Sequence, residues 1–437
     1  MDYFLGLDIG TSSVKASLVS TDGKIIYKKT EKFIYSYENN MKVIDADYFC
    51  KKCFSVMKEL SLSLTESDKI LSLCISGAGG NLLLIKDGKP LSSVISWQNE
   101  FEESIFNQVL PGLSDDEIYN SVGWPKLNSF PLAALSYYKV TQPDLLEDCD
   151  KICMHIEYLG YKLTGNWAIT PSMGTTFYLI DQKSKKYNDK FLKLFDISTD
   201  KLPQIYENCT VYGYIDEKNS FLTGLPAGTP VVCGTFDHPS AARGAGVFDE
   251  NEIMVSCGTS WVVFAPYSSR DIPISKNMLT DPYMSPKGNW CGMKSLASIS
   301  ETIEILKKKY LGEMSYKDFD ALAKKSCKGC NGLVINDEFS DVSGYDKRDI
   351  ARAIIECIAN KLNDMLAELR CDATVIKLVG GITNSEVWCD VISDITKKEV
   401  RIINGEYAGA IGSAIMAGVG IGYYKDEKEA FEAMNFI

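Results

Sequence analysis

The sequence of 437 residues contains only two histidines, His155 and His238, and lacks the motifs of several large enzyme classes. Their separation excludes an H-E-x-x-H metalloprotease site. A Ser-His-Asp triad would have to use one of them, and no G-x-S-x-G motif supports it. Neither G-x-G-x-x-G after a strand nor G-x-x-x-x-G-K-[ST] occurs, which argues against a dinucleotide-binding domain and excludes a P-loop.

The sequence also lacks an excess of positive charge and a long apolar run. Its net charge is −12 and its pI is about 4.9, which argues against a nucleic-acid partner or an anionic membrane. No segment approaches the roughly 20 apolar residues needed to cross a bilayer. The N-terminal stretch "MDYFLGLDIG" has no basic region and runs straight into a strand pattern, so we expect no signal peptide. These features predict a cytoplasmic protein.

Cysteine, in contrast, is frequent, with 14 residues. Four of them form two C-x-x-C pairs, Cys50/Cys53 and Cys327/Cys330, and each pair could supply half of a zinc site or a redox couple. The pairs lie far apart in the sequence, and the first falls within a helical pattern. We therefore expect reduced, inert thiols that pack as small apolar side chains.

The length and the residue patterns predict a two-domain α/β protein, since a single core rarely exceeds about 250–300 residues. Apolar residues at helical spacing predict helices over about 45–65 and 346–370, and another beginning at Ser385. A hairpin is expected around Asp87-Gly88. Small residues dominate the expected C-terminal helix, "YAGAIGSAIMAGVGIGYY".

Two segments share a strand, a Gly-Thr-Ser turn and a second strand: "FLGLDIGTSSVKASLV" and "EIMVSCGTSWVVFA". On its own this repeat is weak, because Gly-Thr-Ser is a common turn composition. Such a turn nevertheless offers backbone N–H groups and hydroxyls that bind anions. Two such turns facing one cleft could hold a polyphosphate.

An Asp-His pair, Asp237 and His238, lies in the stretch "GTFDHPSAARGAG" directly after an apolar strand pattern. Two interpretations are open from the residues alone. Asp237 could cap a helix that starts near Pro239, because proline is favoured at a first helical position. Alternatively, its carboxylate could act as a general base.

Four ordered motifs resemble the FGGY family of carbohydrate kinases. They are "DIGTSSVK" (8–15), "CGTFDHPSAARGAG" (233–246), "SCGTSWVV" (256–263) and "VGGITNSEVWCDVISDITKKEV" (379–400). Weaker matches, including "ISWQNE" and "EYLGYKLTGNW", lie between them. The resemblance extends over essentially the whole chain.

The resemblance implies two RNase H-like domains of the actin, Hsp70 and sugar-kinase superfamily, with ATP in the cleft between them. We place the N-terminal domain at 1–245, with sugar-binding residues, the first phosphate loop and the catalytic Asp, and the nucleotide-binding C-terminal domain at 246–437. It also implies ATP and Mg²⁺ as cofactors and a small sugar or polyol as partner. It is compatible with a homodimer.

The resemblance also assigns roles to individual residues. Asp237 corresponds to the catalytic base, and Asp8 and Asp237 are implied as metal ligands. The residues implied in nucleotide and phosphate binding are Gly10, Thr11, Ser12, Lys15, Gly258, Thr259, Gly381 and Asn384. Those implied in sugar binding are Gly79, Trp97, Gln98, Asn99, Asn128, Asp237 and His238. His155 is expected to be an ordinary packed or solvated residue.

The sugar-binding motif departs from the family pattern. Where the family often carries W-x-D-x-R, this chain reads Trp97-Gln98-Asn99-Glu100-Phe101, so an amide replaces the acid and an aromatic ring replaces the arginine. Neutral donors and acceptors suit an uncharged ketose, such as xylulose or fuculose, or a polyol, better than an aldonate. Two alternatives stay open: an ATPase switch of the same superfamily, and a catalytically altered sugar- or ATP-binding regulator.

Overall fold

The computed structural model describes residues 1–258, 260–284, 288–336, 340–369 and 371–434. The chain forms two compact units, which are treated separately below. The first comprises Met1–Gly246, Ser268–Gly292 and Tyr407–Ile437, and the second comprises Val247–Tyr267 and Met293–Glu406. The predicted single boundary at 245/246 lies beside the first change of unit. The chain then re-enters the first unit twice, because residues 268–292 and 407–437 make their contacts there.

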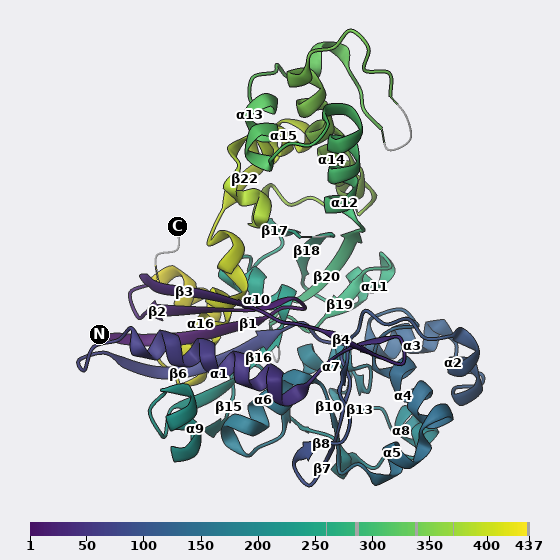
Figure 1. Ribbon diagram of the computed structural model, residues 1–437, viewed down its shortest axis with the longest axis vertical. Helices are drawn as coiled ribbons and strands as arrows, with labels where there is room; N and C mark the ends of the chain where they lie inside the picture. The colour runs from purple at the N-terminus through teal and green to yellow at the C-terminus, as the bar shows by residue number, and fades with distance from the viewer. Residues whose placement is uncertain (259, 285–287, 337–339, 370, 435–437) are drawn as a thin grey trace. The chain divides into compact units, whose positions relative to one another are not determined.

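The first unit contains a six-stranded sheet in the order β15-β16-β6-β1-β2-β3 (Figure 1). Its strands are β1 (Asp2–Ile9), β2 (Ser13–Ser20), β3 (Ile25–Lys32), β6 (Lys69–Gly77), β15 (Val211–Tyr214) and β16 (Pro230–Phe236). Strands β1, β6 and β16 are parallel, and Ile9 and Phe236 both pair with Gly77. The residues that follow β1 and β16 therefore emerge at the same end of the sheet, one on each side of β6.

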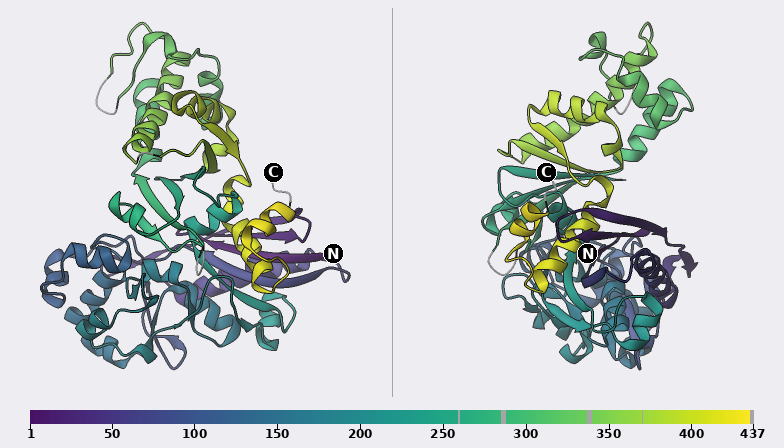
Figure 2. Two further views of the ribbon diagram at one scale, coloured as in Figure 1. Left: turned by 180° about the vertical axis from the view of Figure 1, so that it is seen from behind. Right: turned by 90° about the vertical axis from the view of Figure 1, so that its left-hand side faces the viewer.

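Helix α16 (Ala408–Gly420) lies against one face of strand β1 (Figure 2). Side chains alternate between the two faces of a strand, so Phe4, Gly6 and Asp8 share this face. A Cβ atom added at Gly6 would clash with the α16 backbone, and one at Gly409 would clash with the Asp8 carboxylate. The small residues of this helix therefore bring its first turn directly against Asp8.

Helix α10 (Asp237–Gly244) also packs closely on α16. Gly412 faces the backbone of Ser240, and Gly244 faces the backbone of Ala408, and in both places a Cβ atom would collide with main-chain atoms. Ser240 Oγ also donates to Gly409 O at 2.8 Å. The first turn of α10, with Asp237, is thus fixed against the helix that contacts Asp8.

The sheet of the second unit contains the strand order β20-β18-β17-β21-β22. Its strands are β17 (Glu252–Cys257), β18 (Trp261–Tyr267), β20 (Trp290–Leu296), β21 (Val375–Gly380) and β22 (Glu399–Ile402). Strand β17 pairs antiparallel with β18 and parallel with β21, as β1 does with β2 and β6. The Gly-Thr-Ser repeat therefore marks the same hairpin in both sheets.

Sequence patterns located the long helices well. The predicted helices over 45–65, over 346–370 and from Ser385 are α1 (Ala46–Leu62), α14 (Lys347–Glu368) and α15 (Glu386–Thr396). The hairpin around Asp87-Gly88 joins β7 (Leu83–Lys86) to β8 (Lys89–Pro90). The second unit also contains α12 (Ile299–Leu311) and α13 (Tyr316–Ala323).

The first unit contains further helices and strands outside its six-stranded sheet. The helices are α2 (Glu103–Val109), α3 (Asp115–Val122), α4 (Pro131–Thr141), α5 (Pro143–Asp148), α6 (His155–Thr164), α7 (Pro171–Phe177), α8 (Asp189–Phe195), α9 (Glu217–Thr223), α11 (Asp271–Ser275) and α17 (Glu427–Ala433). The strands are β4 (Ser36–Glu38), β5 (Met41–Ile44), β9 (Val94–Ile95), β10 (Lys151–Cys153), β11 (Ala168–Ile169), β12 (Ile180–Asp181), β13 (Lys186–Tyr187), β14 (Gln204–Ile205) and β19 (Leu279–Asp281). Of the helices described in the two units, none combines the length and apolarity that a bilayer span requires.

A buried carboxyl group in α6 makes the stability of the fold depend on pH. Burial raises the pKa of Glu157 to about 7, although Met154 N donates to Glu157 Oε2 at 2.9 Å. Because the folded-state pKa exceeds the unfolded one, this group favours folding at low pH, and the advantage is lost as the pH rises through 7.

We expect Glu157→Gln to reduce the fall in unfolding free energy between pH 5 and pH 8, because the neutral amide cannot ionise. Urea denaturation at a series of pH values measures this slope. Glu66→Gln, at an exposed position, serves as the control and should leave it unchanged. Equal slopes for Glu157→Gln and the unmodified protein would contradict the prediction.

Candidate active site

Two carboxylates lie at the carboxyl end of the parallel strands of the first unit. Asp8 is the penultimate residue of β1, and Asp237 directly follows β16. The negative charge of Asp237 acts on Asp8, and the positive charge of Lys15, which pairs with Asp8 across the β1–β2 hairpin, opposes it. The parallel arrangement of β1, β6 and β16 places Asp8 and Asp237 at the same end of the sheet, and the antiparallel β1–β2 pair places Lys15 beside Asp8.

Asp8 lies in an environment that disfavours its ionised form. Burial, followed by the nearby charge of Asp237, raises the pKa of Asp8 to about 7, and Lys15 acts in the opposite direction. Its Oδ1 atom is buried and accepts no hydrogen bond from the described residues. A buried carboxylate oxygen beside a second carboxylate is a donor set suited to a hard divalent cation such as Mg²⁺.

The turn between β1 and β2 contains Gly10, Thr11 and Ser12. Gly10 N donates to Ser13 O at 2.9 Å, which closes the turn, and Phe33 N donates to Ser12 O at 2.9 Å. Thr11 is held at both ends, because Tyr35 Oη donates to its carbonyl at 2.6 Å and Trp97 Nε1 donates to its hydroxyl at 3.0 Å. The turn is thus tied to a residue predicted to bind sugar.

Asp237 is itself the first residue of α10, two positions earlier than the sequence-based start near Pro239. Phe236 takes the N-cap position, and no side chain caps the helix. Asp237 Oδ1 accepts from His238 N at 2.7 Å. About a quarter of each of the Asp237 and His238 side chains is exposed. The structure therefore does not favour the capping interpretation and leaves the carboxylate partly open.

The segment that differs from the family's W-x-D-x-R motif, residues 97–101, follows β9 and is hydrogen-bonded to β5. Asn99 Oδ1 accepts from Lys42 N at 2.7 Å, and Asn99 Nδ2 donates to Lys42 O at 2.8 Å. Gln98 Oε1 accepts from Lys42 Nζ at 2.7 Å. Asn99 therefore fastens the segment to β5, and Lys42 is a cation beside it that sequence reasoning missed, because its contact with Gln98 spans 56 residues.

Behind Trp97 lies a buried polar pair, Asn81 and His155. Asn81 Oδ1 accepts from Trp97 N at 3.0 Å, and its Nδ2 lies 3.0 Å from His155 Nδ1. Burial lowers the pKa of His155 to about 3, so the ring is neutral and Nδ1 can accept a hydrogen bond. His155 is a packed residue, as predicted, and it also orients the backbone of Trp97 through Asn81.

The remaining predicted sugar residues lie in the first unit as well. Gly79 faces α7, where a Cβ atom would collide with Thr176. Asn128 accepts a hydrogen bond from Phe101 N through its backbone oxygen, at 2.7 Å. This bond ties the segment before α4 to the end of the Trp97 segment.

In the second unit, three predicted nucleotide residues line one cavity of about 650 Å³. Gly258 directly follows β17, and Gly381 and Asn384 follow β21. Thr259 lies outside the described residues. Sequence reasoning missed the apolar and polar walls of this cavity, which several helices contribute: Ser300, Ile303, Tyr316, Asp320, Ser385 and Trp388.

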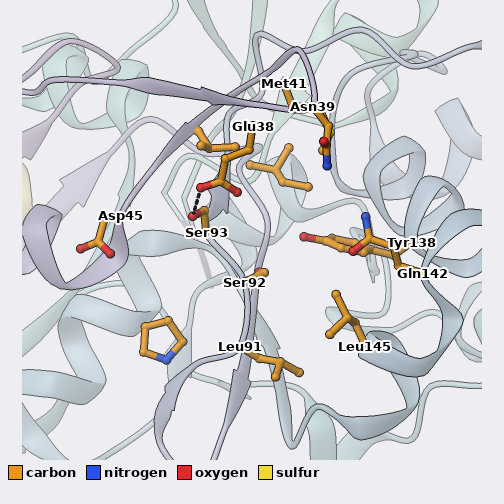
Figure 3. Close-up of a pocket in the computed structure, with 13 residues that line it drawn as sticks. Glu38, Asn39, Met41, Asp45, Leu91, Ser92, Ser93, Tyr138, Gln142 and Leu145 are labelled. Carbon is orange, nitrogen blue, oxygen red and sulfur yellow. Dashed lines mark hydrogen bonds between the residues drawn. The ribbon is translucent and has the colours of Figure 1, made fainter.

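A separate cavity of about 390 Å³ lies in the first unit, between the paired strands β5 and β9 and helix α4 (Figure 3). Glu38, hydrogen-bonded to Ser93 Oγ at 2.8 Å, lies on one side, and Tyr138 and Gln142 lie on the other. None of the predicted site residues lines it.

The two C-x-x-C pairs differ in their surroundings. Cys50 and Cys53 are buried in α1, and burial raises the pKa of both thiols. Cys327 is exposed, whereas Cys330 is buried. Across the described ranges, no three His, Cys, Asp or Glu residues are grouped as a metal site would require.

Comparison with known proteins connects this geometry to a family. The model for the N-terminal domain of the FGGY family of carbohydrate kinases matches residues 3–244, and the model for the C-terminal domain matches 332–421. The chain is 26% identical over 456 residues to a xylulose kinase of Staphylococcus epidermidis, covering 99% of this chain and 90% of that protein. It is 23% identical over 473 residues to a gluconokinase of Bacillus subtilis, with the same two coverages.

The fold agrees with this relationship. The ligand-bound xylulose kinase of Lactobacillus acidophilus superposes with a TM-score of 0.87 at 18% identity, covering 99% of this chain and 92% of that one. The two matched domains span most of the sequence in the order that its motifs predict. The resemblance is thereby confirmed: the chain belongs to the FGGY family of carbohydrate kinases and is an enzyme that phosphorylates a sugar or polyol with ATP.

Proposed function

We propose that this kinase transfers the γ-phosphoryl group of ATP to a hydroxyl of a neutral ketose or related polyol, with Asp237 as the general base. The observation that carries the proposal is that Asp237 and Asp8 lie at the same end of the parallel strands β16 and β1, where the charge of Asp237 acts on Asp8. Phosphoryl transfer needs a group that accepts the proton of the attacking hydroxyl. Asp237 has the partial exposure that this role requires.

We propose that Asp8, together with Asp237, holds Mg²⁺. The unpartnered Oδ1 atom of Asp8 and its raised pKa support this assignment, because a cation would favour the ionised form that burial opposes. When bound, Mg²⁺ neutralises charge on the phosphate oxygens. The Gly10–Ser12 turn would supply backbone N–H groups and hydroxyls to phosphate, and Lys15 a positive charge.

We further propose that ATP binds in the 650 Å³ cavity of the second unit. Gly258 and Gly381 carry no side chain that would obstruct a phosphate or ribose, and Asn384 offers an amide. Thr259 stays a prediction. Because the reaction consumes ATP, we place the enzyme in the cytoplasm.

The substrate class rests on the neutral side chains around the Trp97 segment. Asn99 and His238 take places where the family often carries other polar groups, and no arginine lies in the segment. Lys42 is the one cation that contacts it among the described residues, and its ammonium is engaged by Gln98 and the Tyr35 ring. A preference for an aldonate such as gluconate would therefore assign Lys42 to the substrate carboxylate.

A coupled ADP-release assay over ketoses, polyols, aldoses and gluconate tests the proposal. We expect turnover that a neutral ketose or polyol stimulates. Slow ATP hydrolysis unaffected by any of these compounds would contradict it and favour the ATPase-switch or regulator alternative. Stimulation by gluconate alone would contradict the neutral-substrate assignment and leave the base assignment standing.

His238→Gln tests how the substrate is selected. We expect the relative kcat/KM values for different sugars to change by about tenfold, while the KM for ATP stays within about twofold, because a lost or altered hydrogen bond is worth about 1.4 kcal/mol. Steady-state kinetics with two sugars and ATP measure both effects. A change in ATP affinity without a change in sugar preference would remove His238 from the sugar site.

A further inference from the structure

A fully buried arginine lies on the same helix as the proposed base. Arg243 occupies the last turn of α10, six residues after Asp237, and its side chain has no exposed surface. A buried guanidinium is costly unless its charge is paired and its donors are used. The proposed reaction does not use Arg243, so its retention in the core calls for another role.

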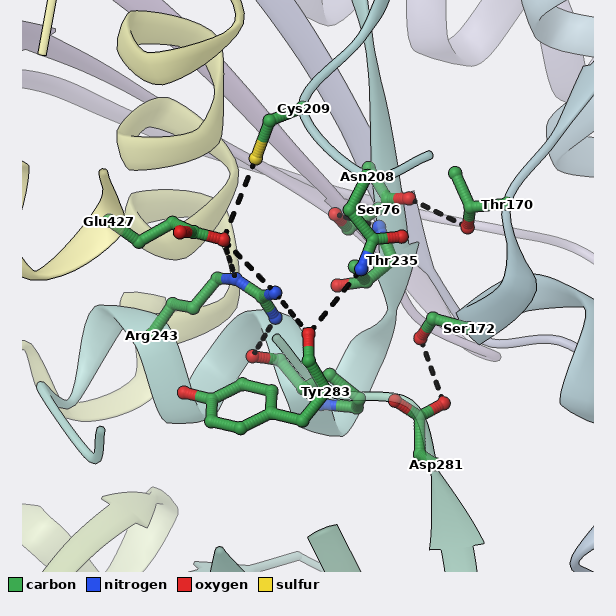
Figure 4. Close-up of polar contacts among 12 residues, drawn as sticks. Ser76, Thr170, Ser172, Asn208, Cys209, Thr235, Arg243, Asp281, Tyr283 and Glu427 are labelled. Carbon is green, nitrogen blue, oxygen red and sulfur yellow. Dashed lines mark hydrogen bonds and ion pairs between the residues drawn. The ribbon is translucent and has the colours of Figure 1, made fainter. Parts of the chain in front are cut away.

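The guanidinium joins three segments that are distant in the sequence (Figure 4). Nη1 donates to Pro239 O, in the first turn of α10, at 3.1 Å. Nη2 donates to Tyr283 O after β19, and the guanidinium stacks over the Tyr283 ring at 4.6 Å. Nε and Nη2 each lie 3.3 Å from Glu427 Oε1 in α17.

Glu427 supplies the charge that makes this burial tolerable. Burial lowers the pKa of Arg243, but the charges around it, with Glu427 first among them, outweigh this effect, and its pKa is raised. Glu427 is the first residue of α17, and its Oε1 atom also accepts a hydrogen bond from Cys209 Sγ at 3.6 Å. The ion pair thus fastens the C-terminal helix to α10.

A second set of bonds fixes the residue before Asp237. Phe236 N donates to Ser172 Oγ at 3.2 Å, and Ser172 Oγ donates to Asp281 Oδ2 at 2.9 Å. Phe236 is therefore held by a side chain from another segment, whereas Pro239 is held by Arg243 of its own helix, which Tyr283 and Glu427 fix in turn. Small displacements of a catalytic group reduce rates strongly, by about 100-fold for 1 Å.

We propose that Arg243 and Glu427 form a positioning pair, which sets the orientation of the first turn of α10 and so presents Asp237 to the acceptor hydroxyl. This inference rests on the proposed role of Asp237. Under this proposal α17, which lies far from Asp237 in the sequence, helps to orient the general base.

Arg243→Lys and Glu427→Gln test the pair. Lysine keeps the charge but lacks the planar, forked guanidinium that bonds Pro239, Tyr283 and Glu427 and stacks on the Tyr283 ring. We expect each variant to lower kcat at least about tenfold, with the KM for ATP within about twofold, since the nucleotide cavity is in the second unit. Because both substitutions disrupt one contact, the double variant should lose less than the product of the two single losses. The controls are Glu432→Gln, at an exposed position of α17, the helix that also contains Glu427, and Arg401→Lys, on β22.

Nucleotide-binding stoichiometry, measured by calorimetry, separates positioning from loss of folded protein. Positioning predicts one nucleotide per chain and a reduced rate per bound site. A binding stoichiometry that falls in parallel with activity, or a rate per site above a third of the original, would overturn the inference. Asp237→Asn keeps the two proposals distinct. If it abolishes transfer while Arg243→Lys does not slow it, only the positioning pair fails; if it leaves the rate unchanged, the base assignment fails, and the inference with it.

Discussion

Replacement of Asp237 by asparagine is expected to lower the rate of sugar-dependent ADP formation by about 100- to 10,000-fold, because a positioned general base contributes that much. Asparagine retains the shape of the side chain and the oxygen that accepts from His238 N, so α10 should keep its start. What the variant loses is the acceptor for the proton of the attacking hydroxyl. Nucleotide affinity should stay nearly unchanged, because no nucleotide-cavity residue is altered.

The matched control is Asp189→Asn. Asp189 is likewise the first residue of its helix, α8, so any general effect of removing a carboxylate from a first helical turn appears in both variants. The Asp189 variant should keep the original rate. An Asp237 variant that retains more than about a tenth of the rate would refute the assignment of the base, given the contribution expected of it.

The second large effect is expected at Asp8. Asp8→Asn should reduce kcat at least about 100-fold and weaken the dependence of the rate on Mg²⁺ concentration, because an amide is a poor substitute for a carboxylate ligand. The same variant should raise the melting temperature of the ligand-free protein at pH 8. There the native carboxylate is ionised against burial and against Asp237, which is why its pKa is raised to about 7.

The sign of this stability effect distinguishes Asp8 from a purely structural residue. Loss of a structural carboxylate would lower the melting temperature, whereas Asp8→Asn should raise it while removing activity. Asp2→Asn, at the other end of β1, is the control and should change neither. Thermal unfolding at pH 5 and pH 8, with and without Mg²⁺, provides the measurement. A lower melting temperature at pH 8, together with an unchanged Mg²⁺ response, would contradict the metal assignment.

Sequence patterns predicted the helices and hairpins that are determined by residues close together in the chain. The hairpin beside Asp8, the helix α1 and the long helix α14 each carry their own periodicity or turn residues, so a local window suffices. The ordered motifs also identified the family, which the domain matches confirm.

Contacts between distant segments escaped prediction. Nothing in "YAGAIGSAIMAGVG" indicates that Gly409 will face Asp8, because a small residue reveals how close a neighbour can come but not which neighbour. The link from Lys42 to Gln98 and that from Arg243 to Glu427 likewise span 56 and 184 residues. The start of α10 was placed two residues late, since Pro239 gave the stronger local signal.

The late return of the chain to the first unit has a consequence for biosynthesis. Strand β1 is translated long before the helix that covers its face with Phe4, Gly6 and Asp8, which residues 408–420 form. During translation this face has no covering helix until those residues have left the ribosome. A premature stop before residue 408 would therefore yield a polypeptide that still carries Asp8 and Asp237 but exposes apolar surface for chaperones and proteases to recognise. Only chains translated past α16 can bring both carboxylates into their native surroundings.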